Sequence, residues 1–381
     1  MESFDLIAAS AFGLEAVVAR ELRDLGYQGK GVQPGWTLFQ GDWEAVCRAN
    51  TWLRAADRVL LRVGEFEAKD FGQLFDQTRE LPWERWIGPQ AAFPVNGRSV
   101  RSQLSSVPAC QRSVKKAIVE RLKKAHQTQT LDEIGPLYQV EASLLKDRVT
   151  LTIDTTGASL HKRGYRTLTG PAPLKETLAA AMVLLSFWRP ERTLVDPFCG
   201  SGTIPIEAAM IARNMAPGAH RRFSAQSWPQ ASGELWRKAR QEALDAVREE
   251  TSLHILGGDL DPQAIQRARR HARQAGVQDQ IQFYQQDIRE LTSRREYGCM
   301  IANPPYGERL GEDQELDALY AEIAAAMKRL ETWSHYVLTS HQDFEQIVGA
   351  SADRRRKLYN GRIECVYYQH HGPRPEKRTE S

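Results

Sequence analysis

Apolar and polar positions along the first 155 residues predict a series of short, mixed elements. Strands are expected where apolar and polar residues alternate, and helices where apolar residues recur every three or four positions. The predicted strands occupy residues 4–9, 35–41, 137–145 and 148–155, and the predicted helices occupy residues 13–25, 43–53 and 107–124. Strand, helix and strand recur through residues 58–100, and Lys146-Asp147 is the turn of a hairpin. We therefore expect an α+β assembly of two small units.

The pattern changes after residues 156–173, a connection rich in glycine and proline that has no periodicity. Beyond it, helices alternate with strands at about residues 192–196, 254–259, 281–285, 297–302 and 334–339. Such alternation indicates βαβ units in a parallel sheet. Residues 357–367 predict an antiparallel hairpin with an Asn360-Gly361 turn. The second half is thus expected to be an α/β domain, followed by a polar, disordered tail at residues 372–381.

The composition is that of a globular protein with apolar cores. The 381 residues exceed one ordinary domain, 41% are hydrophobic, 26% are charged, and the net charge is only +3. The five cysteines are scattered without CxxC spacing, which argues against disulfides and zinc and favours a reducing cytosol. The sequence shows neither a signal peptide nor a membrane-length apolar run, so we expect a cytoplasmic protein without a metal site.

A glycine turn follows the predicted strand at residues 192–196. The string Asp196-Pro197-Phe198-Cys199-Gly200-Ser201-Gly202-Thr203 separates that strand from an apolar helix. Gly200 and Gly202 let the backbone approach a ligand where a Cβ would clash, and N–H groups at the helix start favour an anionic or polar group. Asp196 can accept from a cationic amino group. The turn predicts a nucleotide-like cofactor, with an ordinary strand-to-helix turn as the alternative.

Carboxylates also follow the next two strands. Asp259 ends the strand at 254–259, where a nucleotide site needs an acceptor for the ribose hydroxyls. Asp287 could accept from an adenine amino group, although Asp261 and Asp287 could each equally cap a helix. Nicotinamide enzymes place their acid about 20 residues after the glycine turn, whereas here a Trp-rich helical insertion at residues 217–250 intervenes. The spacing therefore disfavours a dehydrogenase.

The fourth strand of this domain ends in Asn303-Pro304-Pro305-Tyr306. The prolines stiffen the backbone and remove two donors, which leaves carbonyls free to accept. The Asn303 side-chain oxygen and the Pro304 carbonyl can each take one hydrogen of an sp² amino group, and Tyr306 offers a ring for stacking a planar base. A rigid Pro-Pro turn is the alternative. In the context of the glycine turn, the tetrapeptide predicts catalysis on an amino nitrogen.

These two motifs together resemble the class I methyltransferases that modify exocyclic amino groups of nucleobases or glutamine amides. With Leu160–Arg166, Ala172–Ala181 and the continuation of the tetrapeptide to Leu310, nearly the whole chain resembles the THUMP-containing ribosomal RNA guanine-N2 methyltransferases. In that family a ferredoxin-like segment and a THUMP module precede a Rossmann-like domain with a mostly parallel seven-stranded sheet. Some bacterial members continue into a second methyltransferase domain, whereas this sequence stops at Ser381. We therefore do not expect a second modification activity.

The resemblance implies S-adenosylmethionine as cofactor and structured RNA as partner. It places Asp196, Gly200 and Gly202 beside the methionine moiety, Asp259 at the ribose and Asp287 at the adenine. The other cofactor-binding residues expected are Phe198, Thr203, Pro173 and Thr177. The domains expected are a ferredoxin-like segment at 1–45, THUMP at 46–155, a linker at 156–172, the methyltransferase at 173–371 and the tail at 372–381.

Basic residues gather in the first half of the chain. Between Arg98 and Lys124, eight basic residues face a single acid, Glu120. Such a cluster can contact phosphates, although a solvated helix face is the alternative. The RNA-binding residues expected are Arg98, Arg101, Arg112, Lys115, Lys116, Lys162, Arg163 and Arg166. A third basic run, Arg354 to Lys357, could equally be solvated.

Three other functions compete with methylation of guanine N2 in 23S ribosomal RNA. A transfer RNA guanine-N2 methyltransferase would share the THUMP architecture, and the sequence separates it poorly. A DNA adenine-N6 methyltransferase would share the tetrapeptide but needs a major-groove reader, which the first 155 residues do not resemble. A non-enzymatic assembly factor would show decay at Asp196 or Asn303, and both are intact.

Overall fold

The computed structural model describes residues 3–166, 174–249, 252–305 and 313–374, without the side chains of 313–315. The chain divides into two compact units. The N-terminal unit contains residues 1–10, 18–160 and 220–242, and the C-terminal unit contains residues 11–17, 161–219 and 243–381. Tyr306, Pro173, the linker residues 167–172 and the tail residues 375–381 lie outside the described part of the chain.

One seven-stranded sheet runs through the N-terminal unit, in the order β2-β3-β1-β4-β7-β6-β5. Its strands are β1 (Phe4–Ser10), β2 (Gly29–Gln33), β3 (Trp36–Gly41), β4 (Ala56–Glu67), β5 (Val95–Val100), β6 (Gln139–Leu145) and β7 (Arg148–Asp154). The helices are α1 (Glu15–Asp24), α2 (Trp43–Trp52), α3 (Phe71–Glu80) and α4 (Val107–His126), with a short 3-10 turn, η1 (Trp83–Arg85). The expected elements are present, and the exposed, glycine-rich edge strand β2 is an addition.

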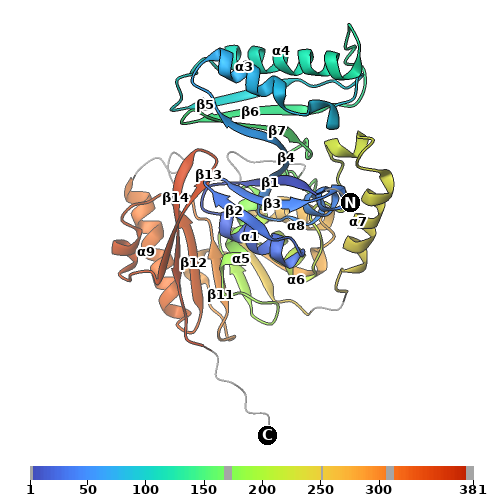
Figure 1. The fold of residues 1–381 in the computed structure, drawn as a ribbon. Helices are drawn as coiled ribbons and strands as arrows, with labels where there is room; N and C mark the ends of the chain where they lie inside the picture. The colour runs from blue at the N-terminus through green and yellow to red at the C-terminus, as the bar shows by residue number, and fades with distance from the viewer. Residues whose placement is uncertain (1–2, 167–173, 250–251, 306–312, 375–381) are drawn as a thin grey trace. The chain divides into compact units, whose positions relative to one another are not determined.

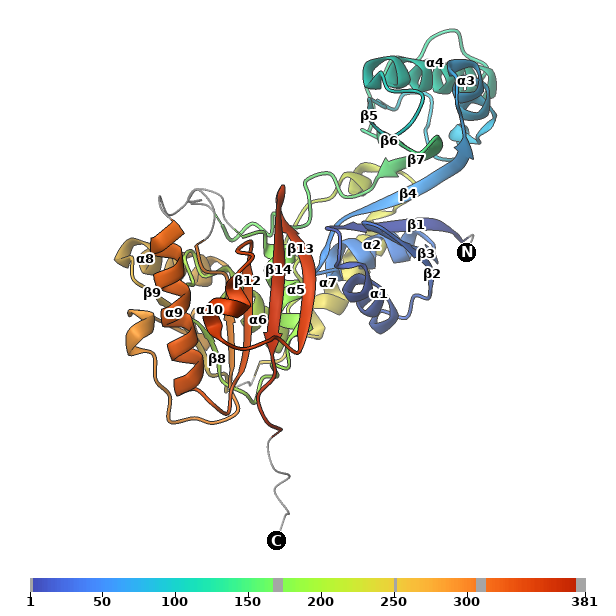
Figure 2. The same cartoon turned by 90° about the vertical axis from the view of Figure 1, so that its left-hand side faces the viewer.

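Strand β4 is the feature that makes this sheet continuous. Its first half pairs with β1 and its second half pairs with β7, with an irregularity between Arg62 and Gly64. Figure 2 shows β4 as a long strand that extends from the β1–β3 group to the β5–β7 group. Helices α3 and α4 lie on one face of the β5–β7 group (Figure 1). The expected domain boundary after residue 45 falls inside α2, an uninterrupted helix that Asp42 caps as predicted.

The insertion within the second half of the sequence belongs structurally to the N-terminal unit. The insertion, residues 217–250, contains η2 (Ser224–Ser227) and α7 (Gly233–Asp245). Its residues 220–242 belong to the N-terminal unit. The Trp228 ring stacks on Tyr138 with ring centroids 4.3 Å apart, and its Nε1 donates to the Leu137 carbonyl. Arg48 donates to both carboxylate oxygens of Glu242 at 2.8 Å. The insertion therefore completes the core on which the N-terminal unit depends.

The C-terminal unit contains a second seven-stranded sheet, in the order β10-β9-β8-β11-β12-β14-β13. Its strands are β8 (Leu194–Asp196), β9 (Ile255–Asp259), β10 (Ile281–Gln285), β11 (Cys299–Ala302), β12 (Ser334–Thr339), β13 (Arg354–Asn360) and β14 (Ile363–His370). Its helices are α5 (Glu176–Leu185), α6 (Thr203–Ala212), α8 (Pro262–Gln274), α9 (Asp313–Arg329) and α10 (Phe344–Val348), with the short turns η3 (Gln278–Gln280) and η4 (Ile288–Glu290). Strands β8 to β12 are parallel, and β13 and β14 add the antiparallel hairpin, which confirms the expected fold class.

Two details of this unit differ from expectation. Asn360 pairs with Ile363 and Gly361 has φ of +65°, so the hairpin turns through Gly361 and Arg362 and not through Asn360 and Gly361. A glycine at the first central position suits the twist of a two-residue hairpin. At the chain end, the Gly372 N–H donates to the Ser334 hydroxyl at 3.1 Å. The packed chain thus continues into the segment that was expected to be a disordered tail.

Candidate active site

The site lies at the carboxyl ends of three adjacent parallel strands. Strand β8 pairs with β9 on one side and with β11 on the other, so the order of strands reverses beside β8. In open α/β sheets, ligands bind at such a switch point, beyond the carboxyl ends of the strands. Asp196 ends β8, Asp259 ends β9 and Asn303 follows β11. The topology thereby gathers three residues that are widely separated in sequence.

The glycine turn between β8 and α6 is fastened to β9. The Cys199 N–H donates to the Gly258 carbonyl at 2.8 Å, and the Gly200 N–H donates to Asp259 Oδ2 at 2.9 Å. Gly202 has φ of +83°, and a Cβ there would lie 3.0 Å from the Cβ of Ala268. A side chain at this position would be both strained and crowded. The conformation of the turn therefore requires glycine at position 202, whether or not a ligand is bound.

Asp196 is a buried carboxyl group, 1% exposed. Burial raises its pKa well above the ordinary range, Asp259 raises it further, and the Phe198 N–H, 3.1 Å from Oδ1, partly opposes them. A cation beside Asp196 would stabilise the ionised form. Two neighbouring carboxylates beside a glycine turn thus fit a ligand that carries positive charge and ribose hydroxyls.

Other expected cofactor residues within the described part of the chain are Phe198 in the turn, Thr203 on α6 and Thr177 on α5. Thr203 is the buried first residue of α6, and its hydroxyl lies 3.4 Å from that of Ser201. Phe198 is partly buried and packs against the apolar cluster that includes Val195 and Met300. Thr177 is buried in the first turn of α5. These positions are compatible with the expected contacts.

The carboxylates after β9 and β10 are also helix caps. Asp261 accepts from the Gln263 N–H and pairs with Arg267 at the start of α8. Asp287 accepts from the Arg289 N–H at 2.9 Å and pairs with the Arg289 guanidinium at 2.6 Å. The hydrogen bonds from Arg289 hold the pKa of Asp287 below its ordinary value. An adenine amino group would therefore share Asp287 with Arg289.

Asn303 presents a buried acceptor at the end of β11. Within the described residues, its Oδ1 atom has no hydrogen-bond partner. A buried amide oxygen without a donor costs about 1–3 kcal/mol, so such atoms call for an explanation. The Pro305 carbonyl lies 3.5 Å from the Tyr320 hydroxyl, which is itself 2.6 Å from the Thr339 hydroxyl. Asn303 therefore carries a buried acceptor without a donor among the described residues, and the backbone two residues further on is contacted by Tyr320.

Arg163 and Arg166 do not form the phosphate surface that was expected of them. The side chains of Arg163 and Glu207 are 1% and 0% exposed and lie 3.4 Å apart, and the Tyr165 hydroxyl donates to Glu207 at 3.0 Å. Arg166 donates to the Leu174 carbonyl at 2.7 Å and lies 3.2 Å from Glu176. Both arginines therefore form ion pairs inside the unit, Arg163 with Glu207 on α6 and Arg166 with Glu176 on α5.

Glu176 and Glu207 are thus structural partners that our sequence interpretation missed. Glu207 interrupts the otherwise apolar helix α6, and this is the signal that could have revealed it. Glu176 is the first residue of the apolar helix α5, where an acidic residue is common, so the signal in the sequence is weaker there. Lys162, by contrast, is exposed. In the third basic run, Arg355 pairs with Glu345 and Lys357 pairs with Glu364, so two of its charges have local partners.

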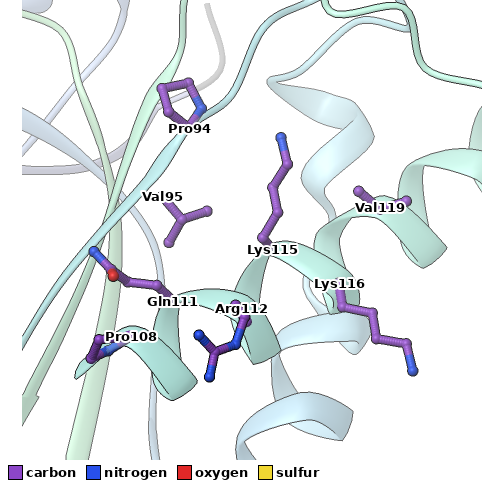
Figure 3. A pocket seen from close by; sticks show the side chains of 8 residues that line it. All are labelled: Pro94, Val95, Pro108, Gln111, Arg112, Lys115, Lys116 and Val119. Atoms are coloured by element: carbon purple, nitrogen blue, oxygen red, sulfur yellow. The ribbon is translucent and has the colours of Figure 1, made fainter. Parts of the chain in front are cut away.

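Helix α4 carries part of the expected RNA surface, beside a pocket of about 620 Å³. Its lining consists of Pro94, Val95, Pro108, Gln111, Arg112, Lys115, Lys116 and Val119 (Figure 3). Arg112 and Lys116 are exposed. In Figure 3 the Lys115 side chain extends toward Pro94. Its ammonium donates to the Phe93 carbonyl at 3.1 Å and pairs with Glu133 at 2.5 Å. Arg112 and Lys116 are therefore better placed than Lys115 to meet phosphates.

The other two expected RNA contacts are Arg98, within β5, and Arg101, directly after the end of β5. Arg98 is exposed and donates to the Ser143 hydroxyl at 2.8 Å, with its guanidinium 5.7 Å from the centre of the Trp36 ring. Arg101 is exposed and adopts φ of +50°. Among the described residues, no helix combines the length and apolar character of a membrane span, and no cluster of three or more metal-ligating side chains occurs.

Three family models match successive parts of the chain. An RlmL ferredoxin-like domain matches residues 5–60, a THUMP domain matches residues 68–154, and an RMKL-like methyltransferase domain matches residues 163–369. The methyltransferase match includes the glycine turn, Asp259 and Asn303. The first match extends beyond α2 into the beginning of β4.

Relatives of known sequence or structure match over the full length. YpsC of Bacillus subtilis (strain 168), provisionally named an RNA methyltransferase, is 48% identical, with 100% of both chains covered. A Listeria monocytogenes (str. 4b F2365) structure, described as a "predicted N6-adenine-specific DNA methylase", is 49% identical, with 98% of this chain and 97% of that chain covered and a TM-score of 0.92. SMU.472, provisionally described as a methyltransferase, was solved with S-adenosylhomocysteine; it is 43% identical, with 99% and 100% covered and a TM-score of 0.93.

The architecture, the motifs at the strand ends and these matches agree. The chain belongs to the RMKL-like methyltransferase family, with an RlmL ferredoxin-like domain and a THUMP domain preceding its methyltransferase domain.

Proposed function

We propose that this protein transfers the methyl group of S-adenosylmethionine to the exocyclic N2 amino group of a guanine in 23S ribosomal RNA. S-adenosylmethionine is the cofactor, as predicted from the sequence. An RNA substrate is supported by the THUMP domain and by the name of the Bacillus relative. The observation that carries the choice of an amino acceptor is the buried Asn303 Oδ1, which has no donor within the described residues.

The cofactor's sulfonium supplies an electrophilic methyl group, and the chain's own groups hold both reactants. Asp196, buried and with a raised pKa, accepts from the cationic amino end of the cofactor, which restores its charged form. Asp259 accepts from the ribose hydroxyls, and the bend through Gly200 and Gly202 leaves room for the ligand.

The target amino group is held by residues that follow β11, the strand that pairs with β8. Asn303 Oδ1 and the Pro304 carbonyl each accept one of its two hydrogens, which turns the nitrogen lone pair toward the methyl group. No strong base is required, because the nitrogen becomes acidic once it is methylated. A paired guanine keeps N2 in the minor groove, so the target base must be unpaired or flipped outward.

Helix α4 of the THUMP domain binds the structured part of the RNA. Arg112 and Lys116 contact phosphates, and the apolar floor of the adjoining pocket can take a base edge or ribose. Phosphate contacts fix the orientation of the RNA and contribute little sequence information. The choice of nucleotide then rests on the catalytic pocket and on RNA shape.

The substrate is tested by mass spectrometry of nucleosides from a strain that lacks this gene. We expect N2-methylguanine to disappear from one position of 23S ribosomal RNA and to return when the gene is restored. Loss from transfer RNA instead would establish the transfer RNA alternative. The description of the Listeria structure favours a second candidate, DNA adenine-N6 methylation. Loss of N6-methyladenine from DNA with unchanged RNA would establish that candidate and overturn our proposal.

A complementary test uses the purified protein with 23S ribosomal RNA from the deletion strain. Transfer of labelled methyl to that RNA, and not to RNA from the complemented strain, is the expected result. The Asn303→Ala variant is the negative control, because it lacks the side-chain acceptor.

A further inference from the structure

The carbonyl of Ser201, in the middle of the glycine turn, accepts a hydrogen bond from a buried histidine. His271 of α8 lies with Nδ1 3.1 Å from this carbonyl oxygen, and the residue is 0% exposed. The residue four positions beyond Ser201 is Pro205, which has no N–H, so α6 offers no i+4 donor to this carbonyl. His271 supplies a donor from a different helix.

This contact completes a series along the turn. Cys199 and Gly200 donate to the end of β9, at Gly258 and Asp259. The next residue, Ser201, is bound by His271, and the one after it, Gly202, rests against Ala268. Three successive residues of the turn are thus hydrogen-bonded to β9 or to α8, the helix that follows it, and the fourth lies close to α8. The segment that carries the ribose-binding acid therefore also shapes the turn.

His271 stands where an apolar residue would normally be found. The buried positions of α8 are Ala264, Ile265, Ala268, His271 and Ala272. Burying a polar group without a partner is costly, so an imidazole in such a stripe needs a compensating hydrogen bond. Burial lowers the pKa of His271, and the imidazole is therefore neutral near pH 7. Since a carbonyl can only accept, the single proton of the ring must reside on Nδ1.

We propose that His271 is a positioning residue for cofactor binding, which holds the Ser201 carbonyl and thereby the shape of the turn from Cys199 to Gly202. The proposal rests on the proposed use of this turn by S-adenosylmethionine. His271 acts through the backbone of the turn, and the required feature is a single N–H donor at the place of Nδ1. A residue that keeps this donor should keep the affinity, whatever its effect on folding.

The test compares two substitutions in the full-length protein. His271→Asn retains an N–H donor close to the position of Nδ1, whereas His271→Leu fills similar space without a donor. Calorimetric titration with S-adenosylhomocysteine should show about tenfold weaker binding for His271→Leu, as expected for loss of one buried hydrogen bond, and near wild-type binding for His271→Asn. In steady-state assays the KM for S-adenosylmethionine should rise for His271→Leu while kcat at saturation stays close to wild type.

A matched control separates positioning from general stability. His335 is another buried histidine of the C-terminal unit, near the amino end of β12 and hence at the opposite edge of the sheet. His335→Leu should lower the melting temperature without changing the affinity for S-adenosylhomocysteine. If His271→Leu is folded and binds as tightly as wild type, the positioning role is wrong. If affinity falls equally in the Asn and Leu variants of His271, in proportion to melting temperature, the role is structural only and the proposal also fails.

The failure of this proposal is distinguishable from failure of the proposed function. Absence of S-adenosylhomocysteine binding by the wild-type protein would remove the cofactor assignment itself. Wild-type binding that His271→Leu leaves intact would remove only the role of His271.

Discussion

The carboxylate of Asp259 and the amide of Gly200 are joined by a hydrogen bond of 2.9 Å, which ties the end of β9 to the turn after β8. The other carboxylate oxygen of Asp259 accepts from the Asp261 N–H at 2.9 Å. A carboxylate has about four lone-pair sites, so each oxygen can still accept from a hydroxyl. One side chain therefore shapes the glycine turn and remains available for the ribose.

Replacement of Asp259 should accordingly weaken cofactor binding more than removal of a single ribose hydrogen bond would. We expect Asp259→Ala to weaken S-adenosylmethionine binding roughly 10- to 100-fold, the range for hydrogen bonds to a charged group. Titration calorimetry measures the change. Asp261→Ala is the matched control, because its side chain caps α8 and should cost only about 1 kcal/mol of stability. Unchanged affinity in Asp259→Ala would refute the assignment.

Asn303→Ala should separate catalysis from cofactor binding. The substitution removes an acceptor for the target amino group and leaves the glycine turn intact. Removal of one preorganised polar group that acts in a transition state lowers kcat by roughly 10²- to 10³-fold. We expect that decrease in methyl transfer, with an S-adenosylmethionine dissociation constant close to wild type. Full methyl transfer by the variant would show that Asn303 does not hold the amino group.

Arg112 and Arg163 should respond differently to substitution. Arg112→Glu, alone or with Lys116→Glu, should weaken RNA binding and reduce the slope of log affinity against log salt by about one for each phosphate that the variant no longer neutralises. Arg163→Ala should instead destabilise the fold, because it leaves Glu207 buried and unpaired, at a cost on the order of 3–5 kcal/mol. Filter binding at several salt concentrations and denaturant unfolding measure the two effects. An altered salt slope in folded Arg163→Ala would place this residue on the RNA after all.

Glu176 should make stability depend on pH. Burial raises its pKa from 4.5 to about 7, although Arg166 opposes the shift. A carboxyl group whose pKa is raised by folding stabilises the protein while it is protonated, and this contribution is lost as the pH rises from about 4.5 to about 7. Denaturant unfolding at pH 5 and pH 8 should therefore show a larger loss of free energy of unfolding for wild type than for Glu176→Gln. Equal losses in both proteins would mean that the pKa of Glu176 is not raised.

Local and contiguous features were predictable from the sequence. The spacing of apolar residues predicted the helices and strands of both units except the exposed edge strand β2, because an element that is buried on one face has apolar residues at a characteristic period. The glycine turn and the tetrapeptide after β11 each act within a few consecutive residues, so their chemistry is readable before folding. The carboxyl ends of parallel strands meet at one edge, which brings Asp196, Asp259 and Asn303 together once their strands are identified.

Pairings between distant segments were decided only by the tertiary structure. The sequence suggested that Arg163 contacts phosphate, but in the structure Arg163 is buried and pairs with Glu207, which lies 44 residues further along the chain. The Trp-rich insertion is read within the methyltransferase domain, yet Trp228 packs on Tyr138 in the core of the N-terminal unit. His271 reads as one more polar helix residue until its hydrogen bond with Ser201 is seen. By itself the sequence determined the elements and the reactive groups, because these follow from local pattern; tertiary structure decided which charges are paired and what holds the cofactor turn, because those depend on which surfaces meet.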